Sequence, residues 1–271
     1  MDRMMKDARQ RCPELSYTSH QRVVKSQVTA IRNCKGVSIR QVHYKKLIKY
    51  TRKTLDIVKD TLRLHGDWLD WAMQATHVIP LIERIIDQTD RRVIKGESVP
   101  VEEKVVSLFE PHTDIIVKDK RQVQYGHKIN FSSGKHGMIL DAVIESGNPA
   151  DSSRLLPLIM RLDKVYGKLP NQVAADAGYA STANIDAAKE LGVKAIGLPK
   201  KRGMTVEAMT GSEWVYKKLK RFRAGIEGNI STLKRAFGLD RCTWKGLDHF
   251  KAYVMSSVLA YNLQKFARLS T

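Results

Sequence analysis

Glu227, a single carboxylate between cations, is the part of this sequence with the clearest potential for chemistry. Arg223 precedes it by four residues, Lys234 follows it by seven, and Lys220 lies three residues before Arg223. Apolar residues around them recur at steps of three and four, which predicts an amphipathic helix with one buried face. At about 100° per residue, the four charged residues fall on a narrow stripe beside that face. Such a helix would offer a carboxylate to a metal ion and cations to phosphates, although an Arg–Glu pair at this spacing is also common on ordinary helix surfaces.

A second carboxylate, Asp176, follows the short apolar run 172–175 and precedes a turn at Gly178. In α/β proteins chemistry collects at the carboxyl ends of strands, where Asp176 would lie. The alternative is an aspartate that only forms the turn. Two carboxylates from different elements can share divalent ions, which stabilise the attacking and leaving oxygens of a phosphodiester. Hard oxygen ligands favour Mg²⁺ (or Mn²⁺), with Asp176 and Glu227 as the expected metal ligands.

The elements that must position these residues change in character near Pro100. Residues 1–100 show helical periodicity and many cations, whereas 101–271 show short β-type runs and then alternating strands and helices. This order predicts an α/β fold with a sheet of mixed direction and helices packed on its faces. The expected strands are 105–109, 114–118, 123–131, 138–145, 172–176 and 194–198, and the expected helices include 155–165 (capped by Asp151 or Ser152), 182–191, the Glu227 helix ending near Gly238, and a closing helix over 250–266.

The chain has 271 residues with 47 Lys and Arg against 28 Asp and Glu, a net charge of +19. An excess this large predicts a polyanionic partner, with nucleic acid first and an anionic membrane surface second. No apolar run approaches the roughly 18 residues of a membrane-spanning helix. Three cysteines match no zinc pattern, which favours reduced thiols in the cytosol. Runs such as Lys45-Lys46 and Arg91-Arg92 are either solvated helix faces or contacts for phosphates.

Together these residues resemble bacterial insertion-sequence transposases of the DDE class, in the group marked by a Tyr-x2-Arg-x3-Glu-x6-Lys signature, with the ISNCY elements as the nearest subgroup. Arg223, Glu227 and Lys234 match that signature, while Lys220 stands at the tyrosine position. Asp176-Ala-Gly-Tyr-Ala-Ser is similar to the block of the second aspartate, although the family usually has glycine where Ala177 stands. Further similar blocks are 107–114, 126–128, 147–151 and 222–227, and the resemblance extends from about Val105 to Leu269.

The resemblance implies a ribonuclease-H-like fold over 101–271, a divalent metal ion, and strand cleavage and transfer at transposon ends. Residues 1–100 would be a helical basic region, either an insertion or part of an amino-terminal segment. Asp176 would be the second metal ligand and Glu227 the third, and the DNA contacts would come from Lys220, Arg223, Lys234, Arg235 and Trp244. The implied partners are double-stranded DNA, as transposon ends and target, and further copies of the chain on that DNA. The implied location is the cytoplasm, associated with the nucleoid.

The first aspartate of the family lies in an Asp-Thr-Thr block, and this sequence contains no such block. Asp114 and Glu110 are the substitutes that the chain offers on an early strand. We therefore expect a carboxy-terminal portion of a transposase that lacks full activity. Two alternatives stay open: a non-catalytic basic remnant that binds DNA and pairs with or inhibits a full-length transposase, and a stand-alone nuclease of the same fold. Metal-dependent cleavage by this chain would distinguish the enzymes from the remnant.

Overall fold

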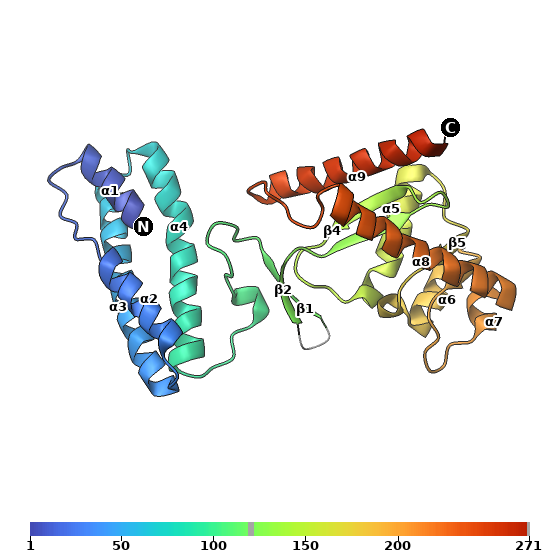
Figure 1. Ribbon diagram of the computed structural model, residues 1–271, viewed down its shortest axis with the longest axis horizontal. Helices are drawn as coiled ribbons and strands as arrows, with labels where there is room; N and C mark the ends of the chain where they lie inside the picture. The colour runs from blue at the N-terminus through green and yellow to red at the C-terminus, as the bar shows by residue number, and fades with distance from the viewer. Residues whose placement is uncertain (119–121, 270–271) are drawn as a thin grey trace. The chain divides into compact units, whose positions relative to one another are not determined.

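The computed structural model describes residues 1–118 and 122–269 and divides into two units, Met1–Thr113 and Asp114–Thr271 (Figure 1). The first unit is helical, as its apolar periodicity predicted. Its elements are α1 (Asp2–Arg11), α2 (Gln21–Asn33), α3 (Val37–Leu64), α4 (Leu69–Thr89), the π-helical turn η1 (Asp90–Ile94) and the 3₁₀ turn η2 (Val101–Glu103).

The long helices α3 and α4 lie side by side in the first unit (Figure 1). Ile48 and Leu55 of α3, separated by two helical turns, are buried against Ile82 and Ile86 of α4. Steps of three and four along α3 place these residues on one face, so the cations between them are left on the other faces. None of the described helices is long and apolar enough to cross a membrane.

The strand expected over 105–109 is not formed, and this prediction was wrong. The side chain of Gln88 on α4 takes the hydrogen bonds that a strand partner would have made. Its Oε1 accepts from the Val105 amide at 2.8 Å, and its Nε2 donates to the Val105 carbonyl at 3.0 Å. A buried backbone group needs a partner but not a particular one, so an apolar β-type run can be held as a loop.

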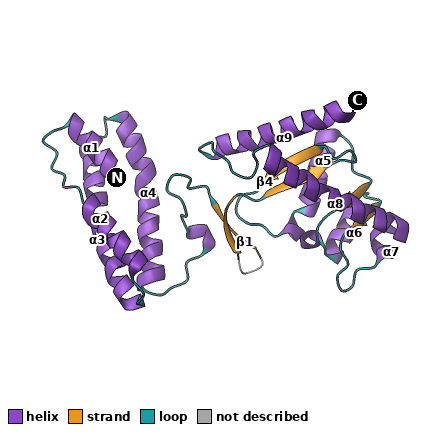
Figure 2. Ribbon diagram, in the orientation of Figure 1, coloured by secondary structure: helices purple, strands orange, loops and turns teal. Residues whose placement is uncertain are grey.

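The second unit mixes strands and helices, which confirms the α/β class (Figure 2). Its strands are β1 (Asp114–Lys118), β2 (Gln122–Gly126), β3 (Ile129–Ser133), β4 (Ile139–Ile144), β5 (Gln172–Ala174) and β6 (Ala195–Gly197). Its helices are α5 (Leu155–Tyr166), α6 (Thr182–Glu190), α7 (Val206–Thr210), α8 (Glu213–Ala236) and α9 (Leu247–Leu269), with 3₁₀ turns η3 (Asp151–Ser153) and η4 (Ala177–Tyr179).

Within the described residues the strands pair in twos, β1–β2 and β3–β4 antiparallel and β5–β6 parallel. The β3–β4 hairpin is predicted from its turn residues, and Gly137 in that turn has a φ of 74°. The single strand expected over 123–131 is instead divided into β2 and β3.

Helix α8 packs directly on the parallel pair β5–β6. The contact is close at Gly197, where a methyl group in place of the glycine hydrogen would lie 2.5 Å from the Cβ of Leu219 on α8. The core beneath it combines residues of α5, α6, β6 and α7 with the residue that follows β6, namely Leu155, Ile159, Ile185, Ala188, Ile196, Leu198 and Met209. The absence of a side chain at Gly197 therefore sets how near α8 lies to the end of β5.

Tyr261 of α9 joins α8 to the β3–β4 hairpin. It is fully buried, and its hydroxyl lies 2.8 Å from Asn229 Oδ1 and 3.0 Å from the Gly137 carbonyl oxygen. Its ring packs edge-on against Phe237, with Ile139 and Leu233 in the same apolar cluster. One side chain thus fixes α8, α9 and the hairpin relative to one another.

Replacing Tyr261 by phenylalanine is expected to lower the free energy of unfolding by about 1 to 3 kcal/mol, because buried oxygen atoms lose their donor. Chemical denaturation followed by circular dichroism would measure the change. Tyr166→Phe is the matched control, since that half-exposed tyrosine donates to the Leu140 carbonyl where water can replace it. An equal loss in both variants would contradict the role assigned to Tyr261.

Candidate active site

Arg223 joins the two carboxylates that the sequence singled out. Its Nη1 donates to Asp176 Oδ1 and, at 3.0 Å, to Glu227 Oε1. Arg223 and Glu227 are one turn apart on α8, whereas Asp176 lies 47 residues earlier in the chain. A strand-end aspartate and a helix glutamate therefore meet at one guanidinium, whereas their sharing of a metal ion stays a prediction.

Two elements bring these side chains together. Asp176 stands just after β5 and begins the tight turn η4, with extended backbone dihedral angles and its carbonyl accepting from the Tyr179 amide at 3.0 Å. Because α8 packs across β5 and β6, its exposed stripe passes the carboxyl end of β5. Each local geometry follows from the sequence, but their meeting depends on the contact between α8 and the strands.

The site is open to solvent on the carboxylate side. The side chains of Asp176 and Glu227 are 56% and 63% exposed, whereas that of Arg223 is 25% exposed. The hydrogen bond to Asp176 raises the pKa of the Arg223 guanidinium, so it stays charged. Exposed ion pairs contribute little to stability, up to about 1 kcal/mol each. The carboxylates are thus available to another cation at modest energetic cost.

A buried hydrogen-bond chain supports the turn that carries Asp176. The Tyr179 hydroxyl donates to Asn130 Oδ1 at 2.8 Å, and Asn130 Nδ2 donates to Glu145 Oε1 at 2.6 Å. Arg154 Nε donates to the same Glu145 oxygen at 2.7 Å. Burial, with the charges of nearby carboxylates led by Asp151 and Asp176, raises the pKa of Tyr179 to about 12, so its hydroxyl remains a donor. No pattern in the sequence had indicated this chain, because its members lie on four different segments.

Asp151 also lies against this turn, which corrects its predicted role as a helix cap. Helix α5 begins after Arg154 and has no side-chain cap. The Asp151 carboxylate instead pairs with Lys128 and approaches Gly178 so closely that any Cβ at Gly178 would collide with it. Lys128 also donates to the Pro149 carbonyl at 2.7 Å. The ion pair with Lys128 therefore stabilises the Asp151 side chain more than capping α5 would. A glycine at 178 is required because the Asp151 carboxylate packs against it.

The structure does not bring Asp114 to this cluster. Its Oδ2 accepts from the Gly147 amide at 2.9 Å and lies 3.0 Å from Nδ1 of His127, whose side chain is 6% exposed. Glu110, the other substitute for a first aspartate, belongs to the first unit and contacts His112 at 2.7 Å. Within the part of the chain that the structure describes, Asp114 forms no hydrogen bond or ion pair with Arg223. A catalytic role for either stays a prediction.

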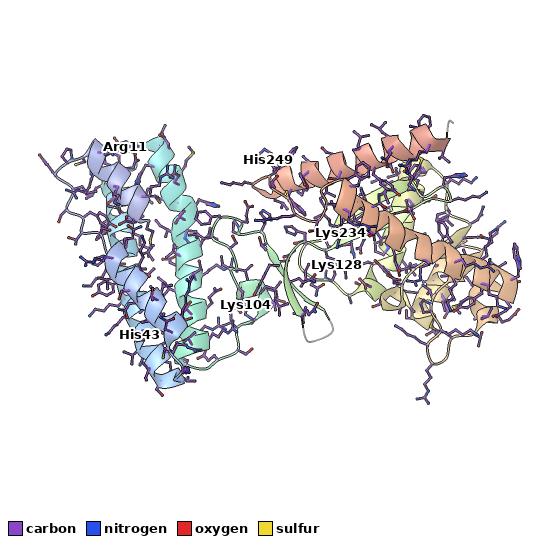
Figure 3. The ribbon with its side chains drawn as sticks, in the orientation of Figure 1. Arg11, His43, Lys104, Lys128, Lys234 and His249 are labelled. Atoms are coloured by element: carbon purple, nitrogen blue, oxygen red, sulfur yellow. The ribbon has the colours of Figure 1, made fainter. Side chains whose placement is uncertain are left out.

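The remaining predicted DNA contacts are exposed. Lys220, Lys234 and Arg235 lie on α8 with exposed side chains, and Lys234 is labelled near the carboxyl end of α8 in Figure 3. Trp244 is 49% exposed and packs edge-on against Tyr253, with ring centroids 5.6 Å apart. These groups are accessible to a polyanion, but their contact with DNA stays a prediction.

The donor set fits a hard divalent cation. Arg223 shows that Asp176 and Glu227 can face one positive group at the same time, and both offer carboxylate oxygens. Mg²⁺ is commonly held by one or two carboxylates with water and substrate phosphate as its other ligands. Among residues 1–118 and 122–269 there is no cluster of three or more His, Cys, Asp or Glu side chains that could hold a metal ion.

Comparison with known proteins identifies the class. Residues 83–263 match the Transposase DDE domain family, and because this match covers most of the chain, the protein belongs to that family. The resemblance drawn from the Arg223, Glu227 and Asp176 blocks is thereby confirmed at the level of DDE transposases, while the ISNCY subgroup stays a prediction. Comparison with curated proteins and with solved structures finds no match.

Proposed function

We propose that this chain acts on transposon DNA by metal-dependent phosphoryl transfer, with Asp176 and Glu227 as metal ligands in a ribonuclease-H-like catalytic domain over 101–271. Membership of the DDE transposase family supports transposition as the process and DNA as the partner. The single observation that carries the proposal is the guanidinium of Arg223 joining Asp176 to Glu227. Carboxylates that converge from a strand end and a helix are the arrangement that two-metal phosphodiester chemistry needs.

Each residue then has a distinct task. Asp176 and Glu227 would hold Mg²⁺ or Mn²⁺, which would stabilise charge on the attacking and leaving oxygens when bound. Once these carboxylates are engaged elsewhere, Arg223 is free to turn to a backbone phosphate, for which its planar donor array is suited. Lys220, Lys234, Arg235 and Trp244 would position the DNA without reading its sequence.

The wider setting follows from the same proposal. The substrates would be double-stranded transposon ends and target DNA, bound by more than one copy of the chain. The net charge of +19 supports a polyanionic partner and fast electrostatic association with it. Association with the nucleoid in the cytoplasm would follow from DNA binding.

Metal uptake tests this proposal. Calorimetric titration of Mn²⁺ into the chain is expected to show binding that Asp176→Asn abolishes, because a neutral amide is a much weaker ligand than a carboxylate. Asp163→Asn is the matched control, since Asp163 is an exposed aspartate on α5 outside the site. Equal Mn²⁺ binding by the wild-type chain and Asp176→Asn would reject Asp176 as a ligand.

A second candidate function is a non-catalytic DNA-binding chain that pairs with or inhibits an active transposase. The observation that favours it is the position of Asp114, whose carboxylate is held by His127 and Gly147 instead of facing Arg223. This alternative predicts duplex binding that falls steeply with salt, together with no Mn²⁺ uptake and no cleavage. The metal titration and a binding assay on the same preparation therefore separate the two functions.

A further inference from the structure

A cationic groove on helix α3 lies outside the candidate active site. It encloses about 400 Å³ and is lined by Lys45, Ile48, Lys49, Arg52, Lys53, Asp56 and Asp90. The α3 residues follow one another at steps of three or one, so they occupy one side of the helix. Ile48, 7% exposed, belongs to the core between α3 and α4, whereas the cations around it are exposed. We call Lys45, Lys49, Arg52 and Lys53 the α3 cation patch.

The α3 cation patch is only partly offset by the protein itself, because four cations share the groove with two carboxylates, Asp56 and Asp90. Within the described residues, Lys45, Lys49, Arg52 and Lys53 form no ion pair. Of the two carboxylates in the groove, Asp90 already pairs with Lys95 at 3.2 Å. Three cations nearby are paired: Lys59 of α3 with Glu83 at 2.5 Å, Arg63 of α3 with Asp60 at 2.7 Å, and Arg91 of η1 with Asp87 at 3.3 Å. The groove therefore keeps an excess of positive charge.

This excess of positive charge is unfavourable for the helix alone. Lys45 and Lys49, and again Lys49 and Lys53, are like charges four residues apart, a spacing at which they repel. Nothing in the packing of α3 requires them, because these side chains are exposed and Ile48 supplies the core contact. A polyanion in the groove would turn the repulsion into attraction.

We propose that the α3 cation patch is a second DNA-binding site, which holds the sugar-phosphate backbone of a duplex independently of the metal site. From Lys45 to Lys53 the helix rises about 12 Å at 1.5 Å per residue, the length of three to four phosphates of one strand. The exposed cations match that ligand in charge and in spacing. The inference rests on DNA as the partner, as in the proposed function, but on neither metal binding nor cleavage. Figure 3 labels His43, which lies on α3 just before the patch.

The test compares two triple variants that lose the same charge. The patch variant is Lys45→Gln/Lys49→Gln/Arg52→Gln, and the control is Arg9→Gln/Arg22→Gln/Lys25→Gln, which removes exposed cations from α1 and α2. Fluorescence anisotropy with a short labelled duplex, in EDTA and over a range of salt concentrations, gives the affinity and its salt dependence.

We expect the patch variant to bind the duplex at least about tenfold more weakly and to reduce the slope of log K against log salt by about three, one for each lost phosphate contact. The control should change the slope by less than about one. Equal losses in both variants would overturn the inference, because net charge alone would then explain binding. A patch variant with the duplex affinity of the wild-type chain would overturn it as well. If that variant instead lost binding to phosphatidylserine vesicles, the patch would be a site for a membrane surface.

A measurement on the wild-type chain keeps the test valid if the patch variant fails to fold. Duplex DNA should protect Lys45, Lys49 and Lys53 from chemical acetylation, read by mass spectrometry, and should leave Lys25 accessible. Equal acetylation of the patch lysines with and without DNA would reject the site. A chain that takes up no Mn²⁺ but shows this protection would reject the proposed catalysis and retain the second DNA site.

Discussion

The Glu227→Gln variant is expected to cleave DNA at a metal-dependent rate about a thousandfold or more below that of the wild-type chain. The reason is that a lost metal ligand removes several kcal/mol of transition-state stabilisation. Glutamine has nearly the same shape and can still accept a hydrogen bond from Arg223, so α8 should keep its structure. Duplex affinity should change little, since Glu227 is an exposed acid among cations that remain in place. Nicking of supercoiled plasmid in Mn²⁺, with anisotropy for binding, would measure both quantities.

Glu213→Gln is the control for this experiment, because Glu213 is an exposed acid in the first turn of the same helix. It should nick and bind as the wild-type chain does. Wild-type nicking by Glu227→Gln would exclude Glu227 as a metal ligand. A wild-type chain that binds the duplex but neither nicks it nor takes up Mn²⁺ would support the non-catalytic alternative.

Gly197→Ala is expected to destabilise the second unit by about 2 to 3 kcal/mol, the cost of overpacking a well-packed core. Its new Cβ would lie 2.5 Å from the Cβ of Leu219. Both atoms are attached directly to backbone, so no side-chain rotation relieves the collision, and α8 must move away from β6. Because α8 carries Arg223 and Glu227 past Asp176, Mn²⁺ uptake should weaken in the same variant.

Gly225→Ala on α8 gives a control of opposite sign. A Cβ at Gly225 meets nothing within 4 Å, and alanine favours the helix over glycine by about 0.5 to 1 kcal/mol. The midpoint of urea denaturation, followed by circular dichroism, should therefore lie at a lower urea concentration for Gly197→Ala than for the wild-type chain. For Gly225→Ala it should lie at a higher one. Equal midpoints for the two variants would show that the approach of α8 to β6 is not limited by Gly197.

Two structural predictions from the sequence failed where a distant side chain competed with a local preference. Residues 105–109 have strand-like composition, but Gln88 on α4 takes the backbone groups of Val105. Asp151 has the residue type of a helix cap, but Lys128 on another segment forms an ion pair with it. Local propensities are worth about 1 kcal/mol, so a single tertiary contact can reverse them.

The sequence by itself determined the amphipathic α8, the β3–β4 hairpin, the mixed α/β class and the resemblance that family membership confirmed. These features follow from apolar periodicity, turn residues and motif spacing, which are local. Only the tertiary structure decided that Arg223 would join Asp176 to Glu227, that Tyr179 would begin a buried chain to Glu145, and that Asp114 would be held elsewhere. The physical reason is that distances between side chains on separate elements depend on packing contacts such as Gly197 against Leu219, which no local pattern specifies.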